Sequence, residues 1–325
     1  MEAQKRLFKI IQSGIPDNQR LSDMVEELLG VCSNSAYRRI RGETELTFSE
    51  LQKICNRFNL SMDEILNYKS GTGALFHFNP LQYSEQESYI SQMKRMLDVL
   101  NRLTLSSDRE IIYAAQSIPF YHLVTQPELA CFNLYVWNKA LNYIDLSYEA
   151  FCRNLDKEGI LSMYKKIHHA FMAIPSKEIW TIHTIGFLLR QLEYFWQIGS
   201  FEKKDTVLQL LNQSTELIDT IHQYADYGLK GGKLQTPFSI YNCSVDLENS
   251  SMIARTENRL LLFIRLHTVN FIETDSEDLC HATFLWNNGL IVKSTLISGE
   301  SSAKQRTRFF KRVKNKIEEC VQKIK

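Results

Sequence analysis

The chain lacks a strong charge of either sign. It carries 38 Lys and Arg residues against 37 Asp and Glu residues, which gives a formal net charge of +1. A protein that binds nucleic acid through its overall charge would be a polycation. Any nucleic-acid site in this chain must therefore be a local patch.

Long apolar runs are also missing. No segment approaches the ~20 uncharged apolar residues that a membrane span needs. The richest run, residues 260–264, is only long enough for a strand. The opening residues, MEAQKRLFKI, have no apolar stretch after their charges and make a poor signal peptide. We expect a cytoplasmic protein with no membrane segment.

Paired cysteines and metal-ligand clusters are absent as well. The 7 cysteines are scattered and include no Cys-x-x-Cys pair, which argues against a disulfide framework or a zinc ribbon. We interpret them as small core residues. The adjacent pairs His168-His169 and Cys280-His281 point to different faces of their elements, and no further ligands stand at a recognisable spacing. We expect no metal.

Catalytic motifs are not found either. The stretch Gly228–Lys233 resembles a phosphate loop, but it lacks the required spacing, and Leu234 stands where a hydroxyl is needed. No Gly-x-Ser-x-Gly motif is present. We therefore expect no cofactor and no enzymatic activity.

Composition divides the chain into several regions. Residues 1–68 contain short helical patterns separated by polar turns, and 69–83 form a linker. Residues 84–232 show long amphipathic helical patterns with few glycines, which predict helical hairpins for dimerisation or ligand binding. Residues 236–325 switch to a period of two and then end in a basic helix. The predicted fold is mainly α, with an α+β C-terminal region.

The aromatic residues of the middle region stand at helical spacing. Such residues line a core more often than a ligand pocket. We interpret this set as core: Trp137, Tyr164, Trp180, Tyr194, Phe195 and Trp196.

The C-terminal region predicts a small antiparallel sheet of about four or five strands. Glu257-Asn258-Arg259 is typical of a hairpin turn, and Asn288-Gly289 is a strong two-residue turn signal between strands 283–287 and 290–294. The terminal helix, about 302–324, is expected to pack on this sheet through an apolar stripe: Phe310, Val313, Ile317, Val321 and Ile324. We interpret its charges as a solvated face rather than a phosphate-binding track.

The first region predicts five short helices. Thr47-Phe48-Ser49-Glu50 and Ser61-Met62-Asp63-Glu64 are capping boxes, in which a hydroxyl and a glutamate satisfy free backbone N–H groups. The predicted helices cover residues 2–13, 22–29, 33–41, 48–58 and 62–67.

The second and third of these helices are joined by a short turn that contains Gly30, an arrangement typical of a helix-turn-helix. In that motif the second helix enters the DNA major groove with its N-terminal residues facing the bases. Helical spacing places Ala36 and Ile40 on the inner face. The outward positions are candidates for DNA contact: Ser33, Asn34, Ser35, Tyr37, Arg38 and Arg41.

The segment "LSDMVEELLGVCSNSAYRRIRGETELTFSELQKICNRFNLSMDEIL", residues 21–66, resembles the lambda-repressor-like (XRE-type) helix-turn-helix regulators. The resemblance implies a five-helix domain that binds operator DNA, usually as a two-fold dimer. It also implies base contacts at Ser33, Asn34, Ser35 and Arg38. The chain departs from many members at Arg39, where they have an apolar residue, and Ile40 takes the packing role.

These patterns predict a sequence-specific DNA-binding transcriptional regulator that acts as a homodimer on double-stranded DNA. Two alternatives stay open. One is a regulator whose helical region senses a peptide or small-molecule effector. The other, of a different class, is a protein-interaction scaffold with no DNA role.

Overall fold

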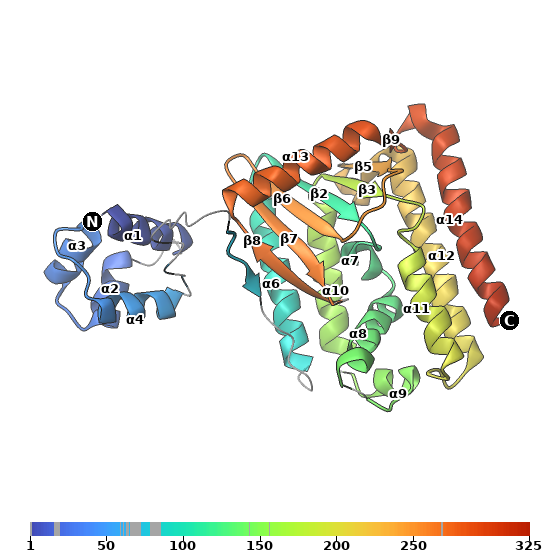
Figure 1. The fold of residues 1–325 in the computed structure, drawn as a ribbon, viewed down its shortest axis with the longest axis horizontal. Coiled ribbons are helices and arrows are strands. Elements are labelled where there is room, and N and C mark those ends of the chain that lie inside the picture. The colour runs from blue at the N-terminus through green and yellow to red at the C-terminus, as the bar shows by residue number, and fades with distance from the viewer. Residues whose placement is uncertain are drawn as a thin grey trace. The chain divides into compact units, whose positions relative to one another are not determined.

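The computed structural model describes residues 2–15, 20–58, 60, 62, 65, 73–78, 86–142, 144–155, 157–267 and 269–325. The chain divides into two compact units, Met1–Leu75 and Phe76–Lys325 (Figure 1).

The first unit consists of short helices around a small core. Its described helices are α1 (Glu2–Gly14), α2 (Leu21–Leu29), α3 (Ser33–Arg41) and α4 (Phe48–Phe58). Each confirms a predicted helix to within one residue at either end. The predicted helix 62–67 lies largely outside the described residues, as does most of the predicted linker. The core is built from apolar side chains that include Leu7, Val25, Ala36 and Ile54, all fully buried.

The second unit begins with a short strand and then alternates helices with strands. Its first half comprises β1 (His77–Phe78), α6 (Gln86–Thr104), β2 (Arg109–Ala115), α7 (Phe120–Leu123), α8 (Pro127–Asn142), α9 (Tyr148–Arg153), α10 (Lys157–Met172), β3 (Ser176–Trp180) and α11 (Gly186–Gln197). Its second half comprises α12 (Lys204–Tyr227), β4 (Leu229–Lys230), β5 (Thr236–Asn242), β6 (Ser251–Thr256), β7 (Leu260–Leu266), β8 (Asn270–Thr274), α13 (Glu277–Lys293), β9 (Thr295–Leu296) and α14 (Ala303–Ile324). Single 3-10 turns cover Gly232–Leu234 and Glu300–Ser302.

The strands of the described chain form one mixed sheet of nine strands. Its order is β1-β8-β7-β6-β2-β3-β5-β4, with β9 paired to β5. The central strands β2, β3 and β5 are parallel, and Ser176 of β3 stands opposite Ile111 of β2 and Phe238 of β5. On the other side, β6, β7, β8 and β1 continue the sheet as an antiparallel meander. The β6–β7 hairpin confirms the predicted turn at 257–259.

This sheet shows that the predicted fold class is wrong. The expected mainly α chain with a small C-terminal antiparallel sheet is replaced by a large mixed sheet whose central strands β2 and β3 come from the region predicted to be all helical. Strands β2 and β3 are short and are buried for most of their length. The run Ile111–Ala115 in β2 shows no period-two alternation, because a central parallel strand is covered on both faces. Strand β3 begins with three polar residues, Ser176, Lys177 and Glu178, so it carries no apolar signal either.

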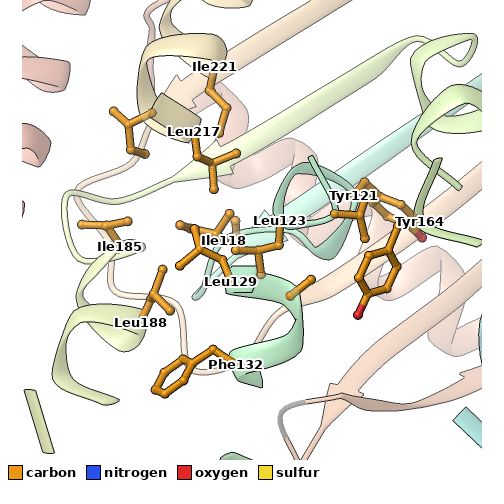
Figure 2. Close-up of a cluster of buried hydrophobic side chains, with 14 of the residues drawn as sticks. Ile118, Tyr121, Leu123, Leu129, Phe132, Tyr164, Ile185, Leu188, Leu217 and Ile221 are labelled. Atoms are coloured by element: carbon orange, nitrogen blue, oxygen red, sulfur yellow. The ribbon is translucent and has the colours of Figure 1, made fainter. Parts of the chain in front are cut away.

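The helices cover both faces of the sheet unequally. In Figure 1, α13 runs along one face, and most of the other helices pack behind the sheet. Ile112 of β2 packs with Cys280 of α13, whereas its neighbour Ile111 faces the larger core on the other side. Figure 2 shows part of that larger core, in which Ile118, Leu123 and Leu129 stand between Ile185 and Tyr121 in this view.

The predicted hairpin around Asn288-Gly289 is also wrong, because this segment lies inside α13. Glu277 and Asp278 stand in the first turn of α13, where negative charge complements the helix dipole. Leu285 and Trp286 are exposed while Cys280 and Leu290 are buried, so the helix is apolar on more than one side. A helix of this kind shows no clean 3.6-residue period, which explains why the turn signal prevailed.

The terminal helix α14 buries the predicted stripe, but against helices rather than the sheet. It packs on α12 and α11, with Phe310, Val313 and Ile317 fully buried. Several of its cations are paired with these neighbours, since Arg306 pairs with Asp226 and Lys323 lies 2.9 Å from Glu193.

Candidate nucleic-acid interface

The turn between α2 and α3 depends on a left-handed glycine. Gly30 has φ 66° and ψ 37°, and its N–H donates to the Glu26 carbonyl at 2.9 Å. Glycine adopts this conformation without the steric cost that other residues incur. The helix α2 therefore stops at Leu29, and α3 begins three residues after Gly30, at Ser33.

Helix α3 has one buried side and one exposed side. Ala36 is fully buried and Ile40 packs against the same core, which confirms the predicted inner face. On the other side, five candidate residues are exposed: Ser33, Asn34, Tyr37, Arg38 and Arg41. The sixth, Ser35, is half-buried, and its hydroxyl lies 3.3 Å from Cys32 Sγ. Contact of these residues with DNA stays a prediction.

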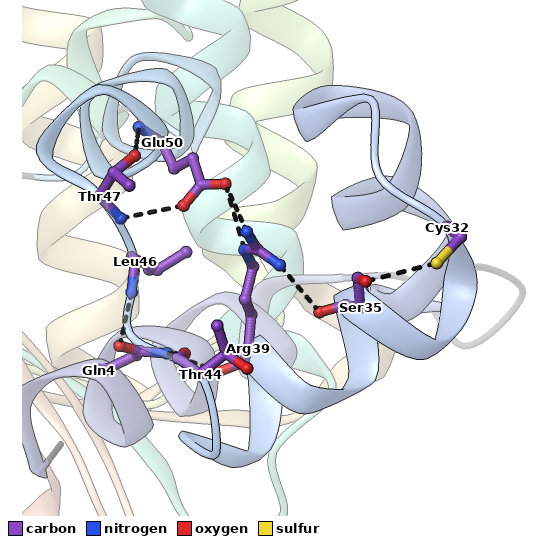
Figure 3. Close-up of polar contacts among 8 residues, drawn as sticks. All are labelled: Gln4, Cys32, Ser35, Arg39, Thr44, Leu46, Thr47 and Glu50. Atoms are coloured by element: carbon purple, nitrogen blue, oxygen red, sulfur yellow. Dashed lines mark hydrogen bonds and ion pairs between the residues drawn. The ribbon is translucent and has the colours of Figure 1, made fainter.

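A side-chain network ties α3 to the start of α4 (Figure 3). The guanidinium of Arg39 donates from Nε and Nη2 to Glu50 Oε1, at 3.2 and 2.9 Å. The other carboxylate oxygen of Glu50 accepts the Thr47 backbone N–H at 2.9 Å, and the Glu50 N–H donates to Thr47 Oγ1 at 3.2 Å. The capping box is thus confirmed. Its glutamate also binds Arg39, which lies at the edge of the buried side of α3.

The electrostatics of this network favour the ionised carboxylate. Burial alone would raise the pKa of Glu50, but the hydrogen bond from the Thr47 backbone and the hydrogen bonds and charge of Arg39 lower it below its ordinary value. At the other end of α3, the hydrogen bond with Ser35 lowers the pKa of the exposed Cys32 thiol.

A second clamp reaches α3 from α1. Gln4 Nε2 donates to the carbonyls of Arg39 and Thr44, at 2.7 and 2.8 Å. Its oxygen accepts the Leu46 N–H at 3.1 Å. One amide side chain therefore fixes the loop that leaves α3 (Figure 3). This loop begins at Gly42, which is left-handed with φ 76°.

The outer cations of α3 are held only loosely. Arg38 and Arg41 have side-chain exposures of 59% and 71%, and each lies near Glu43, at 3.9 and 3.8 Å. Exposed ion pairs at this separation contribute little and exchange easily for another anion. The arrangement leaves two exposed positive groups beside the exposed polar residues of α3.

The sequence did not reveal the positioning roles of Gln4, Arg39 and Glu50. Gln4 lies 35 residues or more from its partners along the chain, and no local pattern identifies such a contact. A signal existed for Arg39, because a charged residue at an expected apolar position needs a partner in order to be half-buried. That partner is Glu50, the glutamate of the capping box.

The second unit holds a different charged cluster, which lies inside the core. His122 Nε2 lies 2.8 Å from Glu178 Oε1, and Trp180 Nε1 donates to Glu178 Oε2 at 2.8 Å. Nearby, Lys230 Nζ lies 2.7 Å from Ser176 Oγ and 3.3 Å from the centre of the Phe171 ring. A carboxylate only accepts hydrogen bonds, so His122 Nε2 carries a proton.

This cluster is inaccessible and its charges depend on each other. Glu178 is fully buried and His122 and Lys230 are 1% exposed. Burial would raise the pKa of Glu178, but the charge and hydrogen bond of His122 and the charge of Lys230 lower it. Burial lowers the pKa of Lys230 to about 7, although Glu178 acts in the opposite direction. No substrate reaches these groups in the described arrangement.

Among the residues that the structure describes, no group of three or more His, Cys, Asp and Glu side chains is placed to hold a metal ion. No helix in the described part of the chain is both long and apolar enough to cross a bilayer.

Comparison with known families adds one finding for the N-terminal region. The family model of the BetR domain matches residues 4–85, about a quarter of the chain. The N-terminal region therefore carries a domain of the DNA-binding regulator type. The match covers α1 to α4 and extends through β1. It does not confirm the finer lambda-repressor-like (XRE-type) resemblance. No curated protein and no solved structure matches the chain.

Proposed function

We propose that the protein is a sequence-specific DNA-binding transcriptional regulator that places α3 in the major groove. The observation that carries this proposal is the exposed polar face of α3 in a helix-turn-helix. The BetR match in the same region supports it. A helix held by two clamps presents its outer side chains in a fixed geometry, which base recognition requires.

The exposed residues divide by chemistry into two roles. Ser33 and Asn34 at the N-terminus of α3 donate and accept hydrogen bonds to base edges, and Arg38 one turn later donates to guanine. Arg41, at the end of the helix, contacts phosphate and exchanges Glu43 for it. Tyr37 lies between these two groups, and Ser35 supports the start of the helix.

We further propose that the protein acts as a homodimer. A single short helix reaches only a few base pairs. Two linked recognition helices raise the affinity without new contacts, because the second binding event becomes intramolecular. The selected DNA would then contain two related half-sites.

The decisive experiment is selection of binding sites from a random duplex-DNA pool with the full chain, at several salt concentrations. The test variant is Arg38→Ala. The matched control is Arg57→Ala, which removes an equally charged, exposed residue from α4. We expect a two-fold motif for the wild type and the control. In Arg38→Ala, discrimination at one base position should fall by about 1–3 kcal/mol.

Other results would contradict the proposal in distinct ways. Salt-sensitive binding without an enriched motif would remove sequence specificity. Enrichment of a single half-site would contradict the proposed homodimer. Absence of DNA binding at low salt, together with partner binding that is insensitive to both salt and Arg38, would favour the interaction scaffold.

The proposed role includes no catalytic step. The buried carboxylate of Glu178 supports this, because the strongest acid–base cluster of the second unit is closed to substrate. A chemical signal would act by binding to the protein rather than by being converted.

A further inference from the structure

A small cavity lies in the second unit between α6 and the antiparallel strands. Its volume is about 60 Å³. Met93 and Met96 of α6 and Met252 of β6 form part of its wall, together with Phe263 and Phe271. One water needs roughly 10–15 Å³, and an engineered cavity of about 150 Å³ binds benzene. This cavity is therefore larger than one water needs and smaller than the benzene cavity, and its flexible methionine side chains can move to admit a larger group.

Two buried side-chain amides line the cavity. Gln92 is 7% exposed and Asn270 is 3% exposed. Gln92 Nε2 lies 3.4 Å from the Val269 carbonyl, which fixes the orientation of the amide. Within the described part of the chain, neither Gln92 Oε1 nor Asn270 Oδ1 has a hydrogen-bond partner. A buried acceptor without a donor costs free energy, and a ligand N–H or O–H would remove that cost.

The charge in the wall limits the kind of donor. Arg265 lines the same cavity, and its guanidinium donates to Ser117 Oγ at 2.8 Å. Burial lowers the pKa of Arg265, but an arginine side chain keeps its charge in proteins. In a partly desolvated wall this charge repels an ammonium group and tolerates a neutral or anionic one.

We propose that this cavity binds a small neutral or anionic molecule with an apolar body and a hydroxyl or amide N–H donor. The apolar body packs against the methionine and phenylalanine side chains. A primary amide donates one hydrogen to each of the oxygens of Gln92 and Asn270, and a hydroxyl shares its single hydrogen between them. The anionic group, where the molecule has one, faces Arg265.

The cavity lies beside the elements that follow the first unit in the chain. The first unit ends at Leu75, and β1 and α6 are the next described elements. Helix α6 is held to its surroundings by Tyr89, whose hydroxyl lies 2.9 Å from that of Tyr164, and by the ion pair of Arg95 with Glu273. If the proposed regulatory function holds, a ligand under α6 would be its effector. The binding site itself does not depend on that function.

The test uses three probes with one carbon skeleton: 2-butanol, 2-butanone and the sec-butylammonium ion. They differ only in the polar group, which is a neutral donor in 2-butanol, an acceptor in 2-butanone and a cationic donor in sec-butylammonium. Each is titrated into the full-length protein with 13C-methyl-labelled methionine and followed by NMR. We expect saturable shifts at Met93, Met96 and Met252 with 2-butanol, and about fivefold weaker binding of 2-butanone because its oxygen cannot donate. The ammonium ion should bind most weakly.

Two variants separate the cavity from general effects. In Gln92→Leu the preference for 2-butanol over 2-butanone should fall to about onefold to twofold. Asn270→Leu should give the same loss and serves if Gln92→Leu does not fold. The control is Gln191→Leu on α11, whose buried Oε1 also has no partner among the described residues but which does not line the cavity. The control should keep the full preference.

Three outcomes would overturn the inference. Linear shifts without saturation would show that the probes do not enter a defined site. Equal affinity for the alcohol and the ketone would remove the role of the two amide oxygens. Tightest binding of sec-butylammonium would contradict the effect of Arg265. The readout is independent of DNA, so a failed DNA selection would leave this result unchanged.

Discussion

The two units of the chain hold their inner charges in different ways. In the first unit, the Arg39–Glu50 pair keeps side-chain exposures of 16% and 17%. In the second unit, His122 and Glu178 are each 1% exposed. A pair that keeps part of its surface in water loses less hydration than a fully buried pair, and it can orient an exposed helix. A fully buried pair incurs a large desolvation cost, which is offset only while every partner stays in place.

The charge network of the first unit therefore joins neighbouring helices, whereas that of the second unit holds together segments that are distant in sequence. The Arg39–Glu50 network joins two neighbouring helices and shapes one surface. The Glu178 network joins α7, β3 and β4, which are far apart in sequence. We expect the first to affect recognition and the second to affect whether the sheet assembles.

The largest effect is expected for Glu178→Gln. The substitution removes the carboxylate that accepts hydrogen bonds from His122 and Trp180 inside the core, which should lower the free energy of unfolding of the second unit by about 3–5 kcal/mol. Urea unfolding followed by tryptophan fluorescence measures it, because all 4 tryptophans lie in the second unit.

The control for this measurement is Glu193→Gln on α11. Glu193 pairs with Lys323, whose side chain is 59% exposed, so its loss should cost less than about 1 kcal/mol. Similar losses in the two variants would show that the buried network has no special importance.

An effect of similar size is expected from the titration of Lys230. In the folded state its pKa is about 7, against an ordinary value of 10.5. Between these values the unfolded chain binds a proton that the folded chain does not, so lowering the pH from 10.5 to 7 favours unfolding. Relative to Lys230→Met, the free energy of unfolding of the wild type should fall steadily as the pH is lowered from 10.5 to 7.

Urea unfolding of both proteins at pH 7, 8, 9 and 10 tests this expectation. Subtracting the curve of the variant removes the titration of every other group that the two proteins share. A difference that stays constant with pH would contradict the buried position of the Lys230 charge.

The smallest effect is expected for Glu50→Gln. Loss of the charged hydrogen bonds to Arg39 should destabilise the first unit by about 1–3 kcal/mol. Because the pKa of Glu50 is lowered, the same contribution is lost in the wild type as the pH falls below the ordinary value of 4.5. Hydrogen exchange of peptides from residues 33–58 measures the change, and the second unit should stay unaffected.

The exposed neighbour Glu45 supplies the control for this substitution. Glu45→Gln should change exchange very little, because exposed charges away from partners contribute little. Equal hydrogen exchange in Glu45→Gln and Glu50→Gln would show that the capping glutamate does not stabilise α3.

The sequence predicted what short-range signals determine. Gly30 and the Thr47–Glu50 capping box act within a few residues, so the bounds of α3 and α4 followed from them. The clamp by Gln4 depends on a contact over 35 residues or more and carries no local signal. The roles assigned to the exposed residues of α3 stay predictions, since no contact with DNA is part of the fold.

The sheet was missed for the same physical reason. Strand β2 pairs with β3 and β6, across roughly 65 and 145 residues of chain. Such pairing is decided by burial on both faces and not by any local period. The error at Asn288-Gly289 was different, because a true turn signal was outweighed by the packing of Cys280 and Leu290.

The short strand β1 protects part of the outer edge of the sheet. It is anchored to β8 through only two pairs, His77 with Glu273 and Phe78 with Ile272, at the edge of the sheet. The pairing covers part of the outer edge of β8, whose unpaired N–H and C=O groups could otherwise bond the strand of another chain.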